Sequence, residues 1–244
     1  MLRIINHIIS RRSAAYPPLC ALLFLTLTVP TAHGFGKKPV VVPPVTPPPV
    51  VTPPPVVTPP TDPSEIIRGR WEAKQRDGAS WSKHVFERLP VLAPKLLAKS
   101  PGDITQFCPG YDNLSATDKK NFWVYLLSSM SELESGHNPA VMYTEAFADA
   151  KGNRVVSRGL LQISIESGNA YGCGFKTAAD LHDPNKNLDC GLRILNKWVG
   201  NDGRLAGQKG SAWQGGARYW SVLRKDPNLG KIKGWNQALR MCAN

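Results

Sequence analysis

The 244-residue sequence lacks the features that mark many metalloproteins and membrane proteins. It contains no Cys-x-x-Cys or His-x-x-x-His pair, and its five histidines are scattered, so the spacing indicates no metal site. The apolar run near the amino terminus falls short of the roughly 20 residues that a membrane-spanning helix needs. We therefore expect no metal, no other cofactor and no stable membrane span.

Acidic residues are also scarce, and this sets the charge of the protein. The 18 acidic residues stand against 30 basic ones, which gives a formal net charge of +12. Such a charge attracts anionic polymers, including nucleic acids and bacterial cell walls. The basic residues are dispersed and no nucleic-acid-binding motif is present. We expect no nucleic-acid partner.

The amino terminus has the pattern of a signal peptide over residues 1–34. Arg3, Arg11 and Arg12 precede the apolar run Leu19–Val29, and Ala32–Gly34 offers a cleavage site with small residues. We expect the protein to be exported to the periplasm or to the extracellular space. Residues 35–64 are mostly Pro, Val and Thr with a period of six, which predicts a disordered or polyproline II linker. The linker is interpreted either as a spacer or as a passive leader.

The remaining residues, 65–244, are expected to form one mainly α-helical domain. Strand-like alternation is missing except in short pieces that flank a predicted turn at Asp149–Gly152. Helices are predicted, from apolar periodicity and breaking residues, at Ile66–Arg76, Trp81–Leu89, Ala93–Lys99, Thr117–Ser135, Pro184–Val199 and Gln214–Arg224.

Cysteine is sparse, with five residues in the whole chain. Cys20 lies in the predicted signal peptide, and its removal leaves four cysteines, an even number that suits disulfides in an oxidising compartment. Four cysteines permit three pairings. We favour Cys173–Cys190, which would bracket one loop, and Cys108–Cys242, which would tie the start of the domain to its end.

Two glutamates lie near the end of the predicted helix Thr117–Ser135. At about 100° per residue, Glu134 falls on the apolar stripe that contains Leu127 and Met130, whereas Glu132 points to the opposite side. Burial on an apolar stripe favours the neutral form of a carboxyl group. Glu134 is therefore a candidate general acid, since such a group must carry a proton near neutral pH.

Three motifs in order surround this glutamate. They are Glu134-Ser135-x-x-Asn138-Pro139, Gly159-Leu160-Leu161-Gln162-Ile163, and Asp183-Pro184 followed by Asn187-Leu188 and Gly191-Leu192-x-Ile194-Leu195. Residues 65–244 thereby resemble the SLT domain of lytic transglycosylases, a relative of goose-type lysozymes. The resemblance implies a lysozyme-like helical domain with a glycan cleft. It also implies cleavage of the β-1,4 bond between MurNAc and GlcNAc in peptidoglycan.

The resemblance assigns roles to individual residues. Glu134 corresponds to the catalytic acid of the family, Gln162 to a sugar contact in the cleft, and Tyr219 to a tyrosine that orients the acid. Ser164 takes the position where goose-type lysozymes carry an aspartate. Among the seven tryptophans, we expect Trp220 to be one that faces sugar.

These assignments favour the one-carboxylate reaction of a lytic transglycosylase, in which the C6 hydroxyl of the sugar closes a 1,6-anhydro ring. The alternative is a lysozyme-type hydrolase, because Glu145 or Asp149 in the loop after Pro139 could supply a second carboxylate. The same two acids could instead contact the ammonium group of de-N-acetylated glucosamine. The second alternative is a wall-binding module without catalysis. In each case we expect a monomer that contacts glycan strands.

Overall fold

The structure is a computed structural model, and it describes residues 66–149 and 151–243. These residues form a mainly α-helical domain with two small antiparallel hairpins. The predicted signal peptide, linker and Cys20 lie outside the described residues. Within the described ranges, no helix combines the length and the apolar character needed to cross a bilayer. In the same ranges, no three His, Cys, Asp or Glu side chains converge as metal ligands would.

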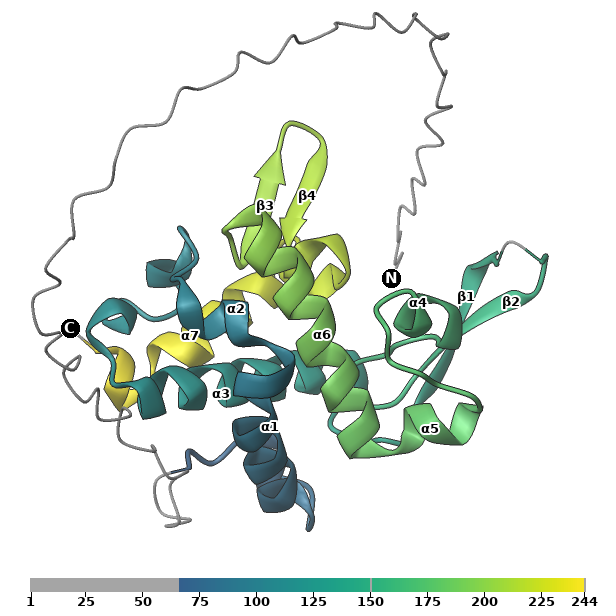
Figure 1. Ribbon diagram of the computed structural model, residues 1–244, viewed down its shortest axis with the longest axis horizontal. Helices are drawn as coiled ribbons and strands as arrows, with labels where there is room; N and C mark the ends of the chain where they lie inside the picture. The colour runs from purple at the N-terminus through teal and green to yellow at the C-terminus, as the bar shows by residue number, and fades with distance from the viewer. Residues whose placement is uncertain (1–65, 150, 244) are drawn as a thin grey trace, which may run out of the picture. The chain divides into compact units, whose positions relative to one another are not determined.

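The order of the elements alternates helices with the two hairpins (Figure 1). The α-helices are α1 (Gly78–Leu92), α2 (Pro94–Ala98), α3 (Ala116–Ser135), α4 (Ile165–Asn169), α5 (Ala178–His182), α6 (Pro184–Asp202) and α7 (Asn228–Gln237). The strands are β1 (Met142–Ala148), β2 (Arg154–Arg158), β3 (Ala206–Lys209) and β4 (Ala212–Gly215). Short 3-10 helices are η2 (Arg70–Ala73), η3 (Ile104–Gln106), η4 (Tyr111–Asn113), η5 (Gly216–Arg218), η6 (Ser221–Leu223) and η7 (Arg240–Cys242).

The two longest helices, α3 and α6, begin and end at residues that suit helix termini. The Ser115 hydroxyl accepts a hydrogen bond from the backbone N–H of Asp118, and α3 ends at Gly136. The Asp183 carboxylate caps α6, Pro184 opens its first turn, and Gly203 follows its last. These local signals explain why both helices were predictable from the sequence.

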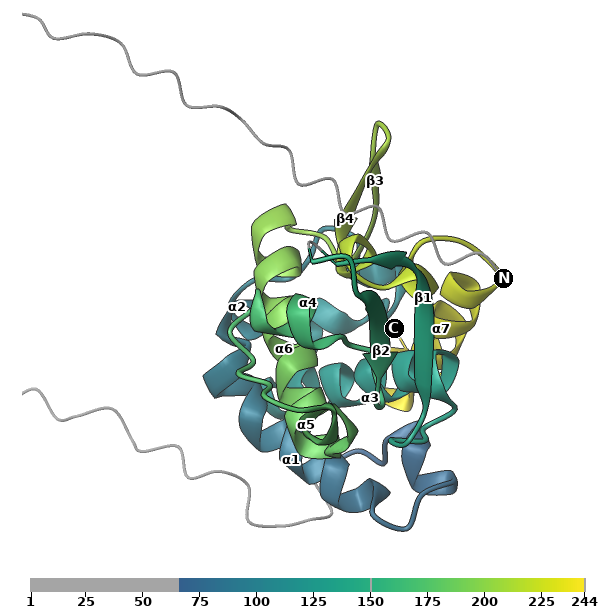
Figure 2. The same ribbon diagram turned by 90° about the vertical axis from the view of Figure 1, so that its right-hand side faces the viewer.

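The core lies where the helices meet. Helix α3 packs against α1, α7 and η2, and α6 packs against α1, α2, α5 and β4. The inner face of α3 is closed by fully buried side chains such as Trp123, Leu127 and Met130. Figure 1 shows the two hairpins projecting from this helical body in different directions, and Figure 2 shows β1 and β2 in front of it.

Both predicted disulfides are present. Cys108 is bonded to Cys242, and Cys173 is bonded to Cys190. The first joins residues 134 positions apart and the second joins residues 17 apart. The long-range bond ties the η7 segment back to the loop between η3 and η4, as the sequence predicted.

Two of the six predicted helices are wrong. Residues of Ile66–Arg76 form only the short 3-10 helix η2, and Gln214–Arg224 forms the end of β4 followed by η5 and η6. In the second segment Gly215 has a positive φ of 59°, which breaks a right-handed helix at its start. The hairpin β3–β4 was therefore missed, whereas the turn predicted at Asp149–Gly152 does lie between β1 and β2.

Candidate functional site

Glu134 lies in the last turn of α3 with its side chain turned into the domain. Its exposed fraction is 8%, and Met130, one turn earlier, is fully buried. The periodicity of the helix therefore places this carboxyl group on the apolar side, as predicted. A carboxyl group in this position can transfer a proton to a substrate that comes within hydrogen-bond reach of it.

Glu132 occupies the other side of the same helix. Its carboxylate pairs with Arg70 at 2.5 Å and with Lys74 at 3.2 Å. Burial alone would raise the pKa of Glu132, but the hydrogen bonds from these two cations lower it below its usual value. Glu132 is thus held ionised in a surface network, and the two neighbouring glutamates have separate environments.

The segment Gly159–Ile163 forms a tight turn next to the end of α3. The Ser135 hydroxyl donates to the carbonyl of Leu160 at 2.9 Å, which ties the turn to the residue after Glu134. Gly159 has a φ of 75°, and a Cβ here would overlap the carbonyl oxygen of Leu181. Only glycine fits both the backbone angle and the space.

Asn187 is the residue of the third motif that fixes this turn. Its buried amide accepts a hydrogen bond from the N–H of Leu161 at 2.9 Å and donates to the carbonyls of Arg158 and Leu181. The sequence singled out Asn187 without a role, and the structure supplies one. The second and third motifs are therefore parts of a single hydrogen-bonded unit.

Gln162 is buried in the same turn with a positive φ of 49°. Its side-chain amide donates to the carbonyls of Val141 and Gly159, at 3.2 and 2.9 Å. The amide nitrogen thus holds the turn to the chain that enters β1. The role of Gln162 as a sugar contact stays a prediction.

Tyr219 follows η5 and is nearly buried. Its hydroxyl shares a hydrogen bond of 2.5 Å with Ser167, whose backbone N–H is capped by Ser164 at the start of α4. Burial raises the pKa of Tyr219 above its usual value, and the nearby charge of Glu134 adds to that shift. Tyr219 therefore lies within electrostatic range of Glu134, while Ser164 serves as a helix cap.

Glu145 is the second buried glutamate of the domain. It lies on β1 with an exposed fraction of 2%, and its carboxylate accepts a hydrogen bond from Ser157 on β2 at 2.7 Å. The strand register breaks between Thr144 and Ala148, so Glu145 falls within a β-bulge. Bulges redirect side chains and are common beside active sites. Ser157, to which the sequence gave no role, is its partner.

Asp149 has a different setting at the tip of the same hairpin. Its carboxylate accepts hydrogen bonds from the backbone N–H groups of Lys151 and Asn153, both at 2.8 Å. These hydrogen bonds lower the pKa of Asp149, chiefly the one from Asn153. The carboxylate closes the turn, and none of the contacts among the described residues joins it to Glu134.

Trp220 was predicted to face sugar, and this prediction is wrong. Its side chain is 2% exposed, and its indole N–H donates to the carbonyl of Leu161 at 2.9 Å. It anchors η5 and η6 to the Gly159–Ile163 turn. Arg224, to which no sequence motif pointed, directly follows η6 and interacts electrostatically with Glu134.

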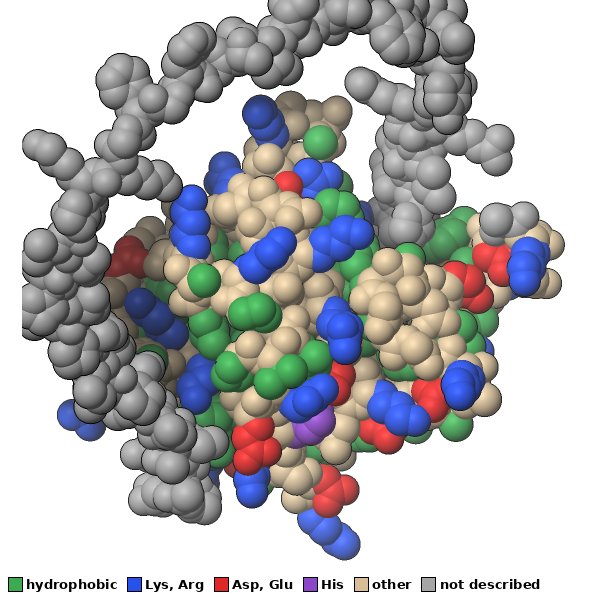
Figure 3. All heavy atoms as spheres, viewed as in Figure 1, with side chains coloured by type: hydrophobic (Ala, Val, Ile, Leu, Met, Phe, Trp, Pro, Cys, Tyr) green, Lys and Arg blue, Asp and Glu red, His purple; other side chains and the backbone are tan. Residues whose placement is uncertain are grey.

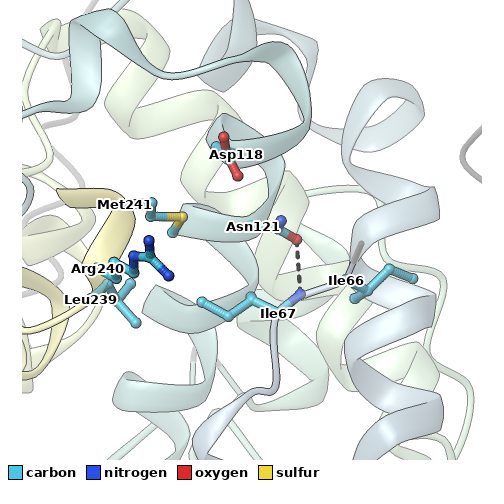
Figure 4. A pocket seen from close by; sticks show the side chains of 7 residues that line it. All are labelled: Ile66, Ile67, Asp118, Asn121, Leu239, Arg240 and Met241. Carbon is cyan, nitrogen blue, oxygen red and sulfur yellow. Dashed lines mark hydrogen bonds between the residues drawn. The ribbon is translucent and has the colours of Figure 1, made fainter. Parts of the chain in front are cut away.

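A pocket of about 460 Å³ opens elsewhere on the domain (Figure 4). Its lining includes Asp118 and Asn121 from the first turns of α3, and Asn121 accepts a hydrogen bond from the N–H of Ile67 at 3.1 Å. Glu134 lies about 20 Å further along the helix axis at 1.5 Å per residue. This pocket is therefore separate from the candidate site.

The fold and the site together define a mainly α-helical, disulfide-bonded domain with two buried glutamates, one at a helix end and one in a hairpin bulge. No protein-family model matches the chain, and no curated protein matches it. Among solved structures, it is similar to "Bd0314 DslA wild-type form 2", with 54% identity and a TM-score of 0.71. That match covers 73% of this chain and 99% of the other.

Two further structures of DslA, in each of which one glutamate is replaced by glutamine, match at 53% and 54% identity with a TM-score of 0.71. They cover 72% and 73% of this chain, and 98% and 99% of their own. Identity of this size over nearly the whole length of the relative shows common descent. The chain belongs to the same family as Bd0314 DslA.

Proposed function

We propose that this protein cleaves the β-1,4 bond between MurNAc and GlcNAc in peptidoglycan, with Glu134 as the general acid. The observation that carries the proposal is the burial of Glu134 beside the Gly159–Ile163 turn and Tyr219. Burial by itself favours a protonated carboxyl group, while the nearby Arg224 cation opposes this, and the protonated form can protonate the departing glycosidic oxygen. The resemblance to the SLT domain supplies the substrate.

The relatives lend support to a second carboxylate. The glutamates replaced in the two DslA mutants lie eleven residues apart in that protein. Glu134 and Glu145 have the same separation in this chain. Among residues 66–149 and 151–243, these are the two buried glutamates. We propose that they form a functional pair.

A pair of carboxylates favours hydrolysis, in which the second group activates water or attacks the sugar. Glu145 is the candidate for such a group, because the Ser157 hydroxyl and the irregular strand register hold its carboxylate in one orientation. We therefore rank the lysozyme-type hydrolase first. The domain would then act on glycan strands that lie along both Glu134 and the β1–β2 hairpin.

The transglycosylase route has its own supporting observation. At the position where goose-type lysozymes carry an aspartate, this chain has Ser164, and its hydroxyl is engaged in capping α4. In that route Glu134 alone would serve first as acid and then as base toward the C6 hydroxyl. The products separate the two routes.

The test uses the full-length protein and purified peptidoglycan sacculi. Wild type should release soluble muropeptides, and Glu134→Gln should reduce release to background while the protein still binds sacculi. Mass spectrometry of the products then shows reducing ends after hydrolysis and 1,6-anhydro ends after transglycosylation. Full release by Glu134→Gln would refute the proposal, and binding without cleavage by wild type would indicate a wall-binding module.

The substrate preference follows from the same pair. We propose that Glu145, rather than Asp149, contacts the ammonium group of de-N-acetylated glucosamine, since the Asp149 carboxylate is occupied by its own turn. Figure 3 shows Lys and Arg side chains spread over the face that carries α6, so a contact for a cation would have to come from a carboxylate of the site itself. Equal rates on acetylated and deacetylated sacculi, in wild type and Glu145→Gln, would end this idea.

A further inference from the structure

Arg224 is a fixed cation beside the candidate site. It follows η6, which packs against α3 and α7. Its guanidinium donates from Nε to the carbonyl of Ala217 at 2.9 Å and from Nη2 to the carbonyl of Arg218 at 3.3 Å. Both carbonyls belong to η5, the segment that leads directly into Tyr219. The guanidinium therefore has a set position relative to that tyrosine.

The same guanidinium lies within range of the proposed acid. Burial lowers the pKa of Arg224 below its usual value, and the negative charge of Glu134 opposes this shift. An arginine starts from a pKa so high that it remains charged at neutral pH. Trp220, next to Tyr219, ties this segment to the turn behind Glu134 through its bond to Leu161. Charge and backbone geometry thus place Arg224 at the edge of the site.

An aromatic ring and a second cation accompany Arg224. Trp213 is half-buried on β4, and its ring centroid lies 5.5 Å from the Arg224 guanidinium and 6.0 Å from the Lys225 ammonium. A guanidinium group over an indole ring gains cation–π stabilisation, and its charge still attracts a carboxylate. The hairpin that carries Trp213 projects from the domain (Figure 1). The cluster therefore combines a cation held by backbone carbonyls with a partly buried ring.

We propose that Arg224, Lys225 and Trp213 form a subsite for a carboxylate on the peptide stem of the sugar bound at Glu134. The inference rests on the proposed function, because peptidoglycan glycans carry stems with free carboxylates next to the bond that is cut. Arg224 and Lys225 bind the carboxylate, and Trp213 covers the stem and keeps water from the ion pair. The subsite makes the enzyme selective for glycans that retain their peptides.

The test compares two substrates with the full-length protein: soluble glycan strands with peptide stems, and the same strands stripped of stems by an amidase. Arg224→Gln should lower kcat/KM on stem-bearing strands roughly 10-fold, mainly through KM, because it removes a charge-assisted hydrogen-bonded contact. The loss on stripped strands should be smaller by roughly fivefold, so that the preference for stem-bearing strands falls. The exposed residue Arg193 on α6 offers a matched control. Arg193→Gln removes the same charge and should leave the ratio of the two activities unchanged.

Two variants protect the test against misfolding, since Arg224 also holds two backbone carbonyls. Arg224→Lys keeps the charge without the planar guanidinium, and Trp213→Ala removes the ring without changing either cation. Both should reduce the preference for stem-bearing strands. If Arg224→Gln is inactive on both substrates, these two variants decide, and an unchanged ratio in both overturns the subsite. A pH profile that shifts equally on both substrates would show that Arg224 only tunes Glu134, which also overturns it.

A binding measurement separates failure of the subsite from failure of the proposed function. Calorimetry with Glu134→Gln protein should give tighter binding to stem-bearing than to stripped strands, and adding Arg224→Gln should remove the difference. If wild type cuts neither substrate but binding still discriminates, the proposed reaction fails and the subsite stands. If cleavage occurs and binding does not discriminate, the subsite fails and the reaction stands.

Discussion

The two hairpins of the domain leave the helical body in different ways. In β1–β2 the regular pairing of Tyr143 with Ser157 gives way to a bulge that holds Glu145. In β3–β4 the register runs without interruption from Ala206 opposite Gly215 to Lys209 opposite Ala212. The first hairpin turns a carboxylate inward, and the second carries no acid along its length. The interrupted strand pairing in β1–β2 thus coincides with a buried carboxylate. The regular pairing in β3–β4 belongs to a hairpin that carries no acidic residue.

The end of each hairpin that joins the helical body, here called its root, is held by different groups in the two hairpins. The first is held by Gln162 and by the Gly159 N–H, which donates to the carbonyl of Val141 at 3.0 Å. The second is held by carboxylates. Asp103 accepts from the N–H groups of Leu205 and Ala206, and Asp202 accepts from the N–H of Gly215 at 2.7 Å. An amide holds one root and anions hold the other, so acid should affect them differently.

The largest expected effect comes from the glycine that ends each hairpin. A Cβ at Gly159 would overlap the carbonyl oxygen of Leu181, and one at Gly215 would overlap that of Leu205. We expect Gly159→Ala and Gly215→Ala each to reduce the free energy of unfolding by about 5 kcal/mol or more. Urea denaturation measures this. Gly210, at the tip of the second hairpin, has open space around it, and Gly210→Ala should cost only about 1 kcal/mol.

The next effect concerns the second root alone. Asp103 is buried, and its carboxylate accepts the two N–H groups at 2.6 and 2.9 Å. Asp103→Ala leaves both donors buried without a partner, so we expect a loss of about 4 kcal/mol in the free energy of unfolding. Hydrogen exchange should rise in β3–β4 before it rises in β1–β2. The exposed Asp112, changed to Ala, serves as control, and an equal loss there would contradict this account.

Acid should weaken the chain leading into the first hairpin before it weakens the second root. His137 is buried against Trp71, and burial lowers its pKa to about 4, although Glu132 at 3.6 Å opposes the shift. Because the folded pKa lies below the unfolded value of 6.5, this contribution is complete above pH 6.5 and is lost as pH falls toward 4. The loss amounts to about 3 kcal/mol.

Asp202 loses its contribution to stability at a lower pH than His137 does. Burial would raise the pKa of Asp202, but hydrogen bonds from Arg218 and the N–H of Gly215 lower it below 3.8. Its contribution is present above pH 3.8 and is lost below it. Urea denaturation of wild type and His137→Gln between pH 7 and 4 tests the contrast. The variant should show a flatter pH dependence, and identical slopes would refute the role of His137.

The sequence predicted the parts of this comparison that depend on local signals. Caps at Ser115 and Asp183 placed α3 and α6, and the apolar stripe placed Glu134 inside the domain. The bulge at Glu145 was not predictable, because strand register depends on contacts across the hairpin and one shifted residue reverses the faces. The prediction that Trp220 faces sugar was wrong for a related reason. Its burial depends on a carbonyl 59 positions away, which no local pattern reports.

The last prediction asks whether the bulge in the first hairpin has a function or is only a structural irregularity. Glu145→Gln keeps the size of the side chain and its bond to Ser157 but removes the charge, so hydrolysis should fall about 100-fold in kcat with the fold unchanged. Ser157→Ala keeps the charge and loses only its orientation, so its loss should be smaller, about 10-fold. Glu166→Gln, an exposed substitution of the same kind on α4, is the control. Release of soluble muropeptides measures all three variants. If Glu145→Gln retained full activity while Glu134→Gln lost it, one carboxylate would suffice, and the bulge would serve the hairpin rather than the reaction.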